Sequence, residues 1–188
     1  MKPLGPALAL AAAMAAPAWA APAPAWTVDK AASRVTFSSS FDGGAFTGRF
    51  QRWDAAIRFD PANLAGSSVT ASFDTASAVT GDATRDEALP EADWFAAARF
   101  PKATFKATAF RALGGGRYQA IGDLTIRGVT KPLTLPFSLA ITGDTARMTA
   151  SIGLNRLAFG VGQGDWKTTE TVPATVTVNI DLTARRAK

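Results

Sequence analysis

Apolar and small polar residues alternate with a period of two along most of this chain. In the segment VTFSSSF (35–41), for example, every second residue from Val35 to Phe41 belongs to one face, and Thr or Ser residues form the other face. A period of two is that of a β-strand with one buried side. The same pattern recurs later in the chain, at 69–74, 118–126, 133–141, 148–154 and 176–182.

Turn-forming clusters separate these alternating segments. They read DGG, DPANLAG, GGG and TGD, at 42–44, 60–66, 114–116 and 142–144. The strands follow one another every ten to fifteen residues or so, roughly the spacing of all-β folds, and leave no room for crossover helices. We therefore expect an all-β fold with an antiparallel sheet, either a sandwich or a closed barrel. An apolar face and a Thr/Ser-rich face over about eight strands favour the closed form, an eight-stranded antiparallel barrel.

The stretch TRDEALPEADWF (84–95) is the exception to this alternation. Thr84 and Glu87 have the spacing of a helical capping box, and acidic residues favour the first turn of a helix. Pro90 cannot continue that helix in its interior. The pattern predicts a short, bent helical insertion near residues 84–98.

The N-terminus predicts export and a single domain. Residues 1–20 contain one Lys, an Ala/Leu-rich run and the small-x-small sequence Ala18-Trp19-Ala20 that a signal peptidase recognises. We expect a signal peptide at 1–20, a linker at 21–25 and one domain at 26–186. The chain has no Cys, so the core alone must stabilise this domain without disulfides.

Composition excludes several kinds of chemistry. The chain has no His, which removes Ser-His-Asp and Cys-His nucleophile systems together with His-ligated zinc and haem. The formal net charge is +5, but the Arg residues are scattered, which argues against a nucleic-acid surface. The acids between 82 and 93 have no EF-hand spacing. We expect no cofactor, no metal site and no catalytic residue.

Four stretches resemble the signatures of one family. They read WTVDKAASRVTF, TRDEALPEADWFAAARFPKATF, GDLTIRGVTKPL and LNRLAFGVG, at 26–37, 84–105, 122–133 and 154–162. Together they resemble the YceI-like family of bacterial periplasmic, lipocalin-like proteins that bind polyisoprenoids. The resemblance runs from about Trp26 to Ala184 and implies a lipocalin-like barrel in the periplasm, with a helical element near one end. One departure is Ala32, where the family often has His, so any chemistry of that His is absent here.

The resemblance also implies an apolar tunnel for a polyisoprenoid, an isoprenoid quinone or a related long-chain lipid. The residues alone do not separate a filled barrel from a hollow one; the resemblance favours the hollow one. Burying ten methylene-like carbons would contribute about 8 kcal/mol before ordering costs, so a long tail needs few specific contacts. The candidate ligand-binding residues are Phe37, Phe41, Phe73, Arg85, Leu89, Trp94, Phe95, Phe105, Phe137, Ile152, Leu154 and Arg156.

Arg156 is the sharpest of these candidates. If the alternation at 152–154 continues, Arg156 points inward, where an unpaired guanidinium would cost several kcal/mol. One alternative is an ion pair with Asp86 or Glu87 that pins the helical insertion to the barrel rim. In the other, Arg156 and Arg85 face the phosphate or quinone carbonyl of a ligand.

Two further possibilities concern the fold and the function. A bulge around Asn155 would turn the next side chain outward and remove both alternatives for Arg156.

The function expected is non-enzymatic sequestration or transport of a lipid. The alternative is a barrel-scaffold enzyme that acts on a lipid or glycan through carboxylates, using Asp86 with Glu87 or Tyr118.

A second rival is an outer-membrane barrel. The Thr/Ser/Lys/Arg face suits water better than lipid, and the chain end TARRAK lacks a terminal aromatic, which argues against it. The sequence leaves open whether two barrels pair as a homodimer and whether the protein makes transient contact with a membrane.

Overall fold

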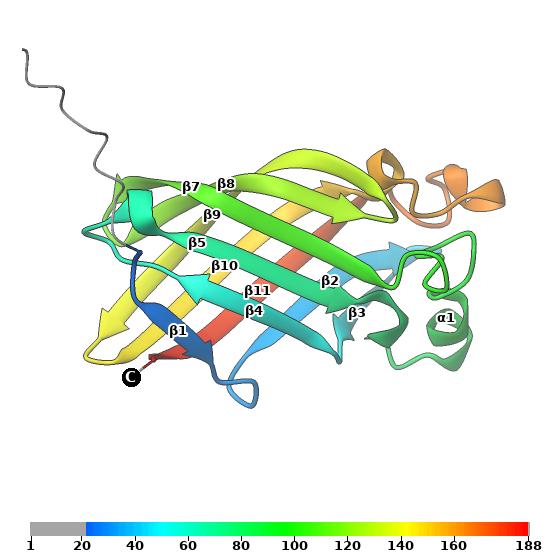
Figure 1. The fold of residues 1–188 in the computed structure, drawn as a ribbon. Coiled ribbons are helices and arrows are strands. Elements are labelled where there is room, and N and C mark those ends of the chain that lie inside the picture. The colour runs from blue at the N-terminus through cyan, green and yellow to red at the C-terminus, as the bar shows by residue number, and fades with distance from the viewer. Residues whose placement is uncertain (1–21, 188) are drawn as a thin grey trace, which may run out of the picture.

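The computed structural model describes residues 22–187. The predicted signal peptide at 1–20 and the first residue of the linker lie outside this part of the chain. The described residues form a closed antiparallel barrel, with one short helix at one end of it (Figure 1). No helix within 22–187 has the length and apolar character needed to cross a membrane.

Eight long strands wind around the barrel in sequence order, as predicted. Three of them are interrupted, so that β1 continues into β2, β3 into β4 and β5 into β6. The strands are β1 (Ala25–Val28), β2 (Arg34–Phe41), β3 (Gly44–Phe50), β4 (Trp53–Arg58), β5 (Ser68–Asp74), β6 (Ala78–Val79), β7 (Lys102–Gly114), β8 (Arg117–Ile126), β9 (Val129–Thr142), β10 (Thr145–Asn155) and β11 (Thr175–Arg186).

The first and last strands close the barrel. Trp26 of β1 lies opposite Arg186 of β11 on one side and opposite Ile57 of β4 on the other. Further along the same edge of β11, β2 takes over the pairing, with Val35 opposite Ile180. Because both halves of this interrupted strand pair with β11, the ring has no free edge along it.

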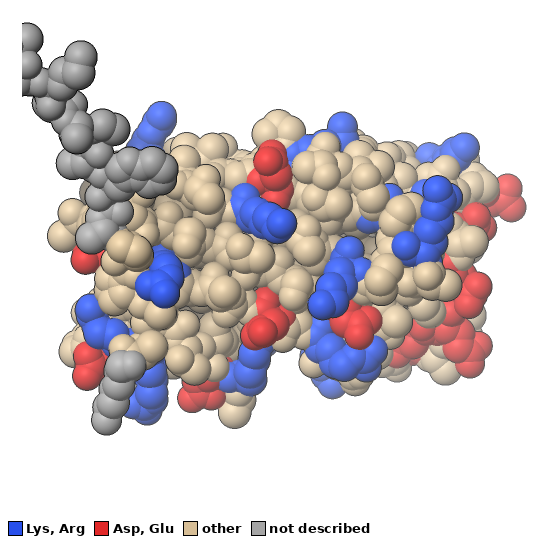
Figure 2. Space-filling model, viewed as in Figure 1, with Lys and Arg blue, Asp and Glu red and all other residues tan. Residues whose placement is uncertain are grey.

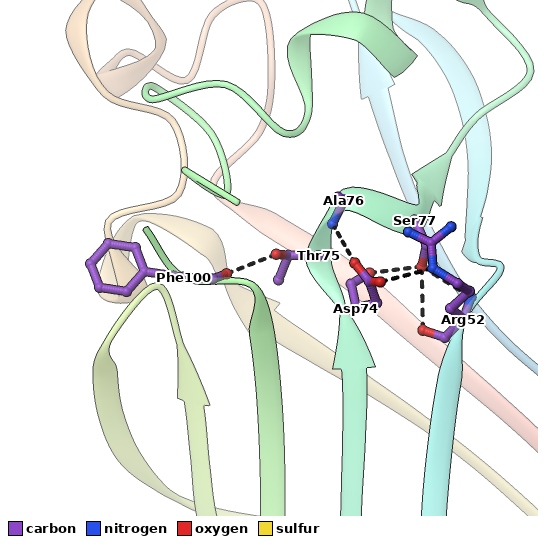
Figure 3. Close-up of polar contacts among 6 residues, drawn as sticks. All are labelled: Arg52, Asp74, Thr75, Ala76, Ser77 and Phe100. Carbon is purple, nitrogen blue, oxygen red and sulfur yellow. Dashed lines mark hydrogen bonds and ion pairs between the residues drawn. The ribbon is translucent and has the colours of Figure 1, made fainter. Parts of the chain in front are cut away.

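The interruption after β5 is a 3-10 turn, η2 (Thr75–Ser77), capped by a carboxylate. Asp74 accepts a hydrogen bond from the amide of Ala76 at 3.0 Å and one from Nε of Arg52 at 2.8 Å (Figure 3). Arg52 comes from the facing interruption between β3 and β4. The two breaks are therefore tied to each other, and both strands bend at the same level of the barrel.

Two fully buried hydroxyls complete this bend. Thr75 Oγ1 donates to the carbonyl of Phe100 at 2.8 Å, and Ser77 Oγ donates to the carbonyl of Asp74 at 2.7 Å (Figure 3). A buried hydroxyl is costly unless it is hydrogen-bonded, and both are. The polar turn can therefore lie inside the wall without an energetic defect.

The helical insertion is present, but its cap differs from the prediction. Helix α1 spans Ala83–Ala88, and irregular turns continue to residue 99. Its N-cap is Asp82, whose carboxylate accepts from the amide of Arg85 at 3.0 Å. The capping box of Thr84 and Glu87 is therefore wrong, because Thr84 already lies inside the helix.

Helix α1 shares its end of the barrel with the long connection between β10 and β11 (Figure 1). This connection contains the 3-10 turns η3 (Arg156–Phe159) and η4 (Gly164–Lys167). At the other end, η1 (Leu64–Gly66) joins β4 to β5. On the face shown in Figure 2, Lys and Arg are spread over the barrel wall, and Asp and Glu gather at the α1 end.

Candidate functional site

The interior of the barrel contains two adjoining cavities. The inner cavity has a volume of about 170 Å³, and the mouth cavity, at the α1 end, has a volume of about 410 Å³. The two cavities adjoin each other, because five residues line both of them. The shared residues are Val35, Phe73, Leu124, Leu154 and Val178.

The inner cavity is lined entirely by apolar side chains, and an aromatic cluster lies at its far end. Phe59 is the centre of this cluster, with ring centroids 5.4 Å from Phe110, 5.3 Å from Tyr118 and 5.9 Å from Phe137. Trp26 donates from its indole Nε1 to the carbonyl of Phe59 at 2.9 Å, so its one polar group is satisfied. This end of the cavity therefore suits an apolar part of a ligand.

The mouth cavity is walled by aromatic and aliphatic residues of β2, β3 and the two end loops. Unlike the inner cavity, it also has polar lining residues. The polar groups lie at one end of a long apolar interior, which is the distribution that suits an amphipathic molecule. The polar residues that line the mouth cavity are Ser39, Thr80, Asp82, Thr84, Arg85 and Arg156.

Arg156 points inward and is only 5% exposed, but its partners are carbonyls and not a carboxylate. Every hydrogen bond that its guanidinium makes to the described residues goes to the backbone of the β10–β11 connection. Nε donates to Pro173, Nη1 to Val161, and Nη2 to Trp166, Thr168 and Val172, at 2.7 to 3.1 Å.

The predicted ion pair of Arg156 with Asp86 or Glu87 is therefore wrong. The physical reason is that carbonyl dipoles converge on the guanidinium from the surrounding loop and satisfy its donors without an anion. Burial lowers the pKa of Arg156, yet an arginine stays protonated. No bulge interrupts the pairing of β10 with β11 at Asn155: this residue ends β10 and caps η3, accepting from the amide of Leu157 at 3.0 Å.

Arg85 is engaged at the rim of the mouth. Its Nη1 lies 3.6 Å from Asp82, its Nε donates to Thr80 Oγ1 at 3.2 Å, and its Cζ lies 4.9 Å from the centroid of the Phe46 ring. A cation over an aromatic face is held by the ring quadrupole. Arg85 is therefore held in place by three neighbours at the edge of the cavity.

Asp86 holds the turn that precedes α1. It accepts from the amide of Thr80 at 2.5 Å, from Thr80 Oγ1 at 2.7 Å and from the amide of Gly81 at 3.3 Å. Burial raises the pKa of Asp86, but these hydrogen bonds and the charge of Arg85 together outweigh burial and leave the pKa below its ordinary value. Glu87 is exposed on the helix.

An aromatic contact joins the two loops of the mouth. The rings of Trp94 and Trp166 lie 5.3 Å apart, and Phe41 of β2 lies 6.2 Å from Trp166. The amides of Gly162 and Gln163 also donate to the carbonyl of Asp93, at 2.8 and 2.7 Å. The insertion and the β10–β11 connection therefore form one packed rim over the cavity.

All twelve sequence-predicted ligand residues line the cavities. Phe105, Phe137 and Ile152 line the inner cavity, and Phe73 and Leu154 line both. The remaining seven line the mouth cavity: Phe37, Phe41, Arg85, Leu89, Trp94, Phe95 and Arg156. The structure brings the predicted set together along one axis.

Other lining residues were missed. Met148 belongs to an alternating segment, so its inward position could have been found from the pattern, as could that of Trp53. Phe110 points inward only because a register shift between Ala107 and Ala109 changes the side of β7 on which the later residues lie, and the period of two does not predict this shift. Trp166 lies in a glycine-rich connection without periodicity, so no sequence signal indicates that it reaches the cavity. A ring in such a loop can be placed only by the fold.

The groups named for carboxylate chemistry lie apart. Tyr118 is stacked on Phe137 in the far aromatic cluster, whereas Asp86 lies in the turn before α1. Among the described residues that line either cavity, Asp82 is the one carboxylate. Within 22–187, no group of three or more acidic residues could hold a metal ion.

Fold and interior together define a closed β-barrel protein with a long apolar cavity and a polar mouth. The YceI-like domain model matches residues 26–184, and the chain belongs to this family. A UPF0312 protein of Vibrio cholerae is 37% identical over 132 residues, which is 69% of either chain. A UPF0312 protein of Pseudomonas syringae is 32% identical over 157 residues, which is 79% of this chain and 78% of that one.

Solved structures agree with this assignment. The crystal structure of BcnA from Burkholderia cenocepacia has a TM-score of 0.80 and 35% identity, over 83% of this chain and 98% of BcnA. A polyisoprenoid binding domain from Saccharophagus degradans has a TM-score of 0.70 at 17% identity, over 87% of this chain and 99% of that domain. This second likeness shows that the fold is shared.

Proposed function

We propose that this protein binds a polyisoprenoid, an isoprenoid quinone or a related long-chain lipid and sequesters or carries it without chemical change. The observation that carries the proposal is the pair of adjoining cavities, one wholly apolar and one with polar groups at its rim. A long tail would occupy the inner cavity and its headgroup would stay in the mouth cavity.

The energetics support such a ligand. Each buried methylene contributes about 0.8 kcal/mol, so a tail of ten carbons supplies about 8 kcal/mol before ordering costs, in the range of micromolar affinity. No polar contact along the inner cavity is needed for this. A polyisoprenoid is also the ligand named for the Saccharophagus degradans domain with the same fold.

We further propose that the protein acts in the periplasm. The small-x-small sequence ending at Ala20 supports export. Cell fractionation should find the protein in the periplasmic fraction, and intact-mass measurement should give a chain that begins at Ala21. Retention of residues 1–20 on a cytoplasmic protein would contradict this location.

Lipid binding is tested by extraction and by titration. Protein purified from its native host should release an apolar lipid into organic solvent, in amounts comparable to the protein, and mass spectrometry would identify it. Lipid-free protein should then bind geranylgeraniol saturably, with a change in tryptophan emission that Trp94→Phe reduces, because Trp94 lines the mouth cavity. If the purified protein retains no lipid and the lipid-free protein shows no saturable change in emission, the barrel is not a lipid carrier.

A further inference from the structure

The polar chemistry of the mouth cavity indicates what kind of headgroup it accepts, if the lipid-binding function proposed above holds. The two cationic side chains in its wall are Arg156 and Arg85. A phosphate or diphosphate would need at least one of them as a partner. Their other contacts therefore decide whether an anion is a suitable ligand.

Arg156 has little to offer an anion. Its guanidinium donates to five backbone carbonyls, as described above, and a phosphate could take one of these hydrogen bonds only by displacing a carbonyl. A displaced buried carbonyl would lose its partner, which offsets what the phosphate gains. Arg156 therefore acts as the internal support of the β10–β11 connection.

Arg85 is also balanced by nearby charge. Asp82 lies 3.6 Å from its Nη1, and the charge of Arg85 lowers the pKa of Asp86. The loops around the mouth, residues 80–99, 127–128 and 157–172, contain four basic residues: Arg85, Arg99, Arg127 and Lys167. Against these four they have seven acidic residues: Asp82, Asp86, Glu87, Glu91, Asp93, Asp165 and Glu170.

Figure 2 shows the same imbalance on one face, where Asp and Glu gather at the α1 end. An anionic headgroup would approach past this excess of acidic residues, and Arg85, the lining cation with donors to spare, is already faced by Asp82. An uncharged headgroup meets neither obstacle.

One polar group in the mouth has no partner. Ser39 lies on the inward face of β2 between Phe37 and Phe41, and its Oγ is buried without a hydrogen bond to any described residue. Its strand neighbour Phe46 is the ring on which Arg85 is stacked. The hydroxyl of Ser38, one residue earlier, is bonded to Thr47 Oγ1 at 3.1 Å.

We propose that the mouth cavity selects a lipid with an uncharged oxygen headgroup, a hydroxyl or a quinone carbonyl, which hydrogen-bonds to Ser39 Oγ. A serine hydroxyl both donates and accepts, so either kind of oxygen can pair with it. The apolar rings on both sides hold the headgroup at the level of Ser39. A phosphate is disfavoured, because its charge would be desolvated while Asp82 already balances Arg85.

The test compares four probes with the same tail of four isoprene units: geranylgeraniol, a menaquinone, geranylgeranyl phosphate and the headgroup-free hydrocarbon. The alcohol and the quinone should bind at least about tenfold more tightly than the phosphate. Ser39→Ala should weaken the alcohol and the quinone by about fivefold to tenfold and leave the hydrocarbon unchanged. Ser38→Ala, which removes a hydroxyl from the same strand, should change none of the four affinities.

A second variant tests the charge argument. Asp82→Asn keeps a good N-cap for α1 but removes the negative charge beside Arg85. The affinity for the phosphate, taken as a ratio to the affinity for the alcohol, should rise by up to about fivefold. Tighter binding of the phosphate by the unmodified protein, or equal effects of Ser39→Ala and Ser38→Ala, would overturn the inference while leaving lipid binding intact. Failure of all four probes to bind would instead overturn the proposed function.

Discussion

Gly162 lies directly against the guanidinium of Arg156, at a backbone φ of +87° that side chains rarely adopt. A Cβ at this position would also lie 3.2 Å from the carbonyl oxygen of Trp166, which is itself bonded to Arg156. Gly162→Ala should therefore lower the free energy of unfolding by about 3 kcal/mol, from backbone strain together with displacement of the guanidinium. Urea denaturation measures this loss.

The matched control for Gly162 is Gly114, the last residue of β7. Gly114 has φ +82°, but a Cβ there would meet nothing within 4 Å. Gly114→Ala should show the strain alone, about 1 kcal/mol. Equal losses in the two variants would mean that contact with Arg156 contributes nothing.

Replacing Arg156 should loosen the whole β10–β11 connection. Arg156→Ala leaves five carbonyls without their common donor and should cost about 3 kcal/mol or more. Arg156→Lys should recover little of this, because an ammonium cannot reach carbonyls on several sides of a planar guanidinium. Thermal denaturation and proteolysis within 157–174 provide the measurement.

Glu87→Gln distinguishes two ways of holding Arg156: the backbone carbonyls found in the structure, and the ion pair that the sequence suggested. Glu87 is exposed and is not among the partners of Arg156, so its neutralisation should leave stability within about 0.5 kcal/mol of the unmodified protein. A loss of stability as large as that of Arg156→Ala would support the ion pair and contradict the carbonyl contacts as the main support of Arg156.

The depth of the cavity should set the length of the tail. Ala55 of β4 lines the inner cavity. Ala55→Leu should therefore fill part of that cavity and weaken geranylgeraniol by about tenfold, with little effect on geraniol, whose tail is half as long. Titrations of both alcohols against both proteins measure this selectivity.

Ala56→Leu is the control for filling the cavity, because Ala56 is exposed on the outer face of the same strand. It should leave both affinities unchanged. If Ala55→Leu weakened the binding of the short and the long alcohol equally, the inner cavity would not discriminate between tails of different length.

Asp86 should make the turn before α1 sensitive to acid. The pKa of Asp86 lies below its ordinary value of 3.8, so the ionised carboxylate stabilises the fold. This contribution is fully present above pH 3.8 and is lost as the pH falls through the lowered pKa. Asp86→Asn should cost about 1 kcal/mol at neutral pH, and the difference from the unmodified protein should shrink toward pH 2 or so.

Unfolding by urea at a series of pH values measures that difference. Asp123→Asn is the control, because Asp123 is exposed on β8 far along the chain from this turn. A difference between Asp86→Asn and the unmodified protein that stayed constant with pH would rule out titration of Asp86 as its source.

The strands and most of the cavity wall could be predicted from the sequence. Phe105 and Phe137 occupy alternating positions, and a period of two fixes the side of a strand on which each residue lies. Both therefore point inward in the structure as predicted. The helical insertion was also predictable, because its spacing breaks that period.

The cap of the insertion was not predictable from spacing alone. Thr84 with Glu87, and Asp82 by itself, are both acceptable N-terminal signals. The choice depends on the backbone: Gly81 takes a positive φ and Asp82 follows in an extended conformation, so the helix begins one residue before Thr84. The turn that Asp86 stabilises therefore selects Asp82 over Thr84 as the N-cap.

The sequence by itself determined the strands, the inward face of most of them and most of the apolar residues available to a lipid, because these follow from a local period. The closure of the barrel and the inward position of Phe110 beyond the register shift in β7 do not follow from that period. Only the tertiary structure decided the partners of Arg156 and the isolation of Ser39 Oγ. The partners of Arg156 are backbone carbonyls of an irregular loop, and every residue has a carbonyl whatever its side chain. Their convergence on one guanidinium depends on how that loop folds back over the mouth.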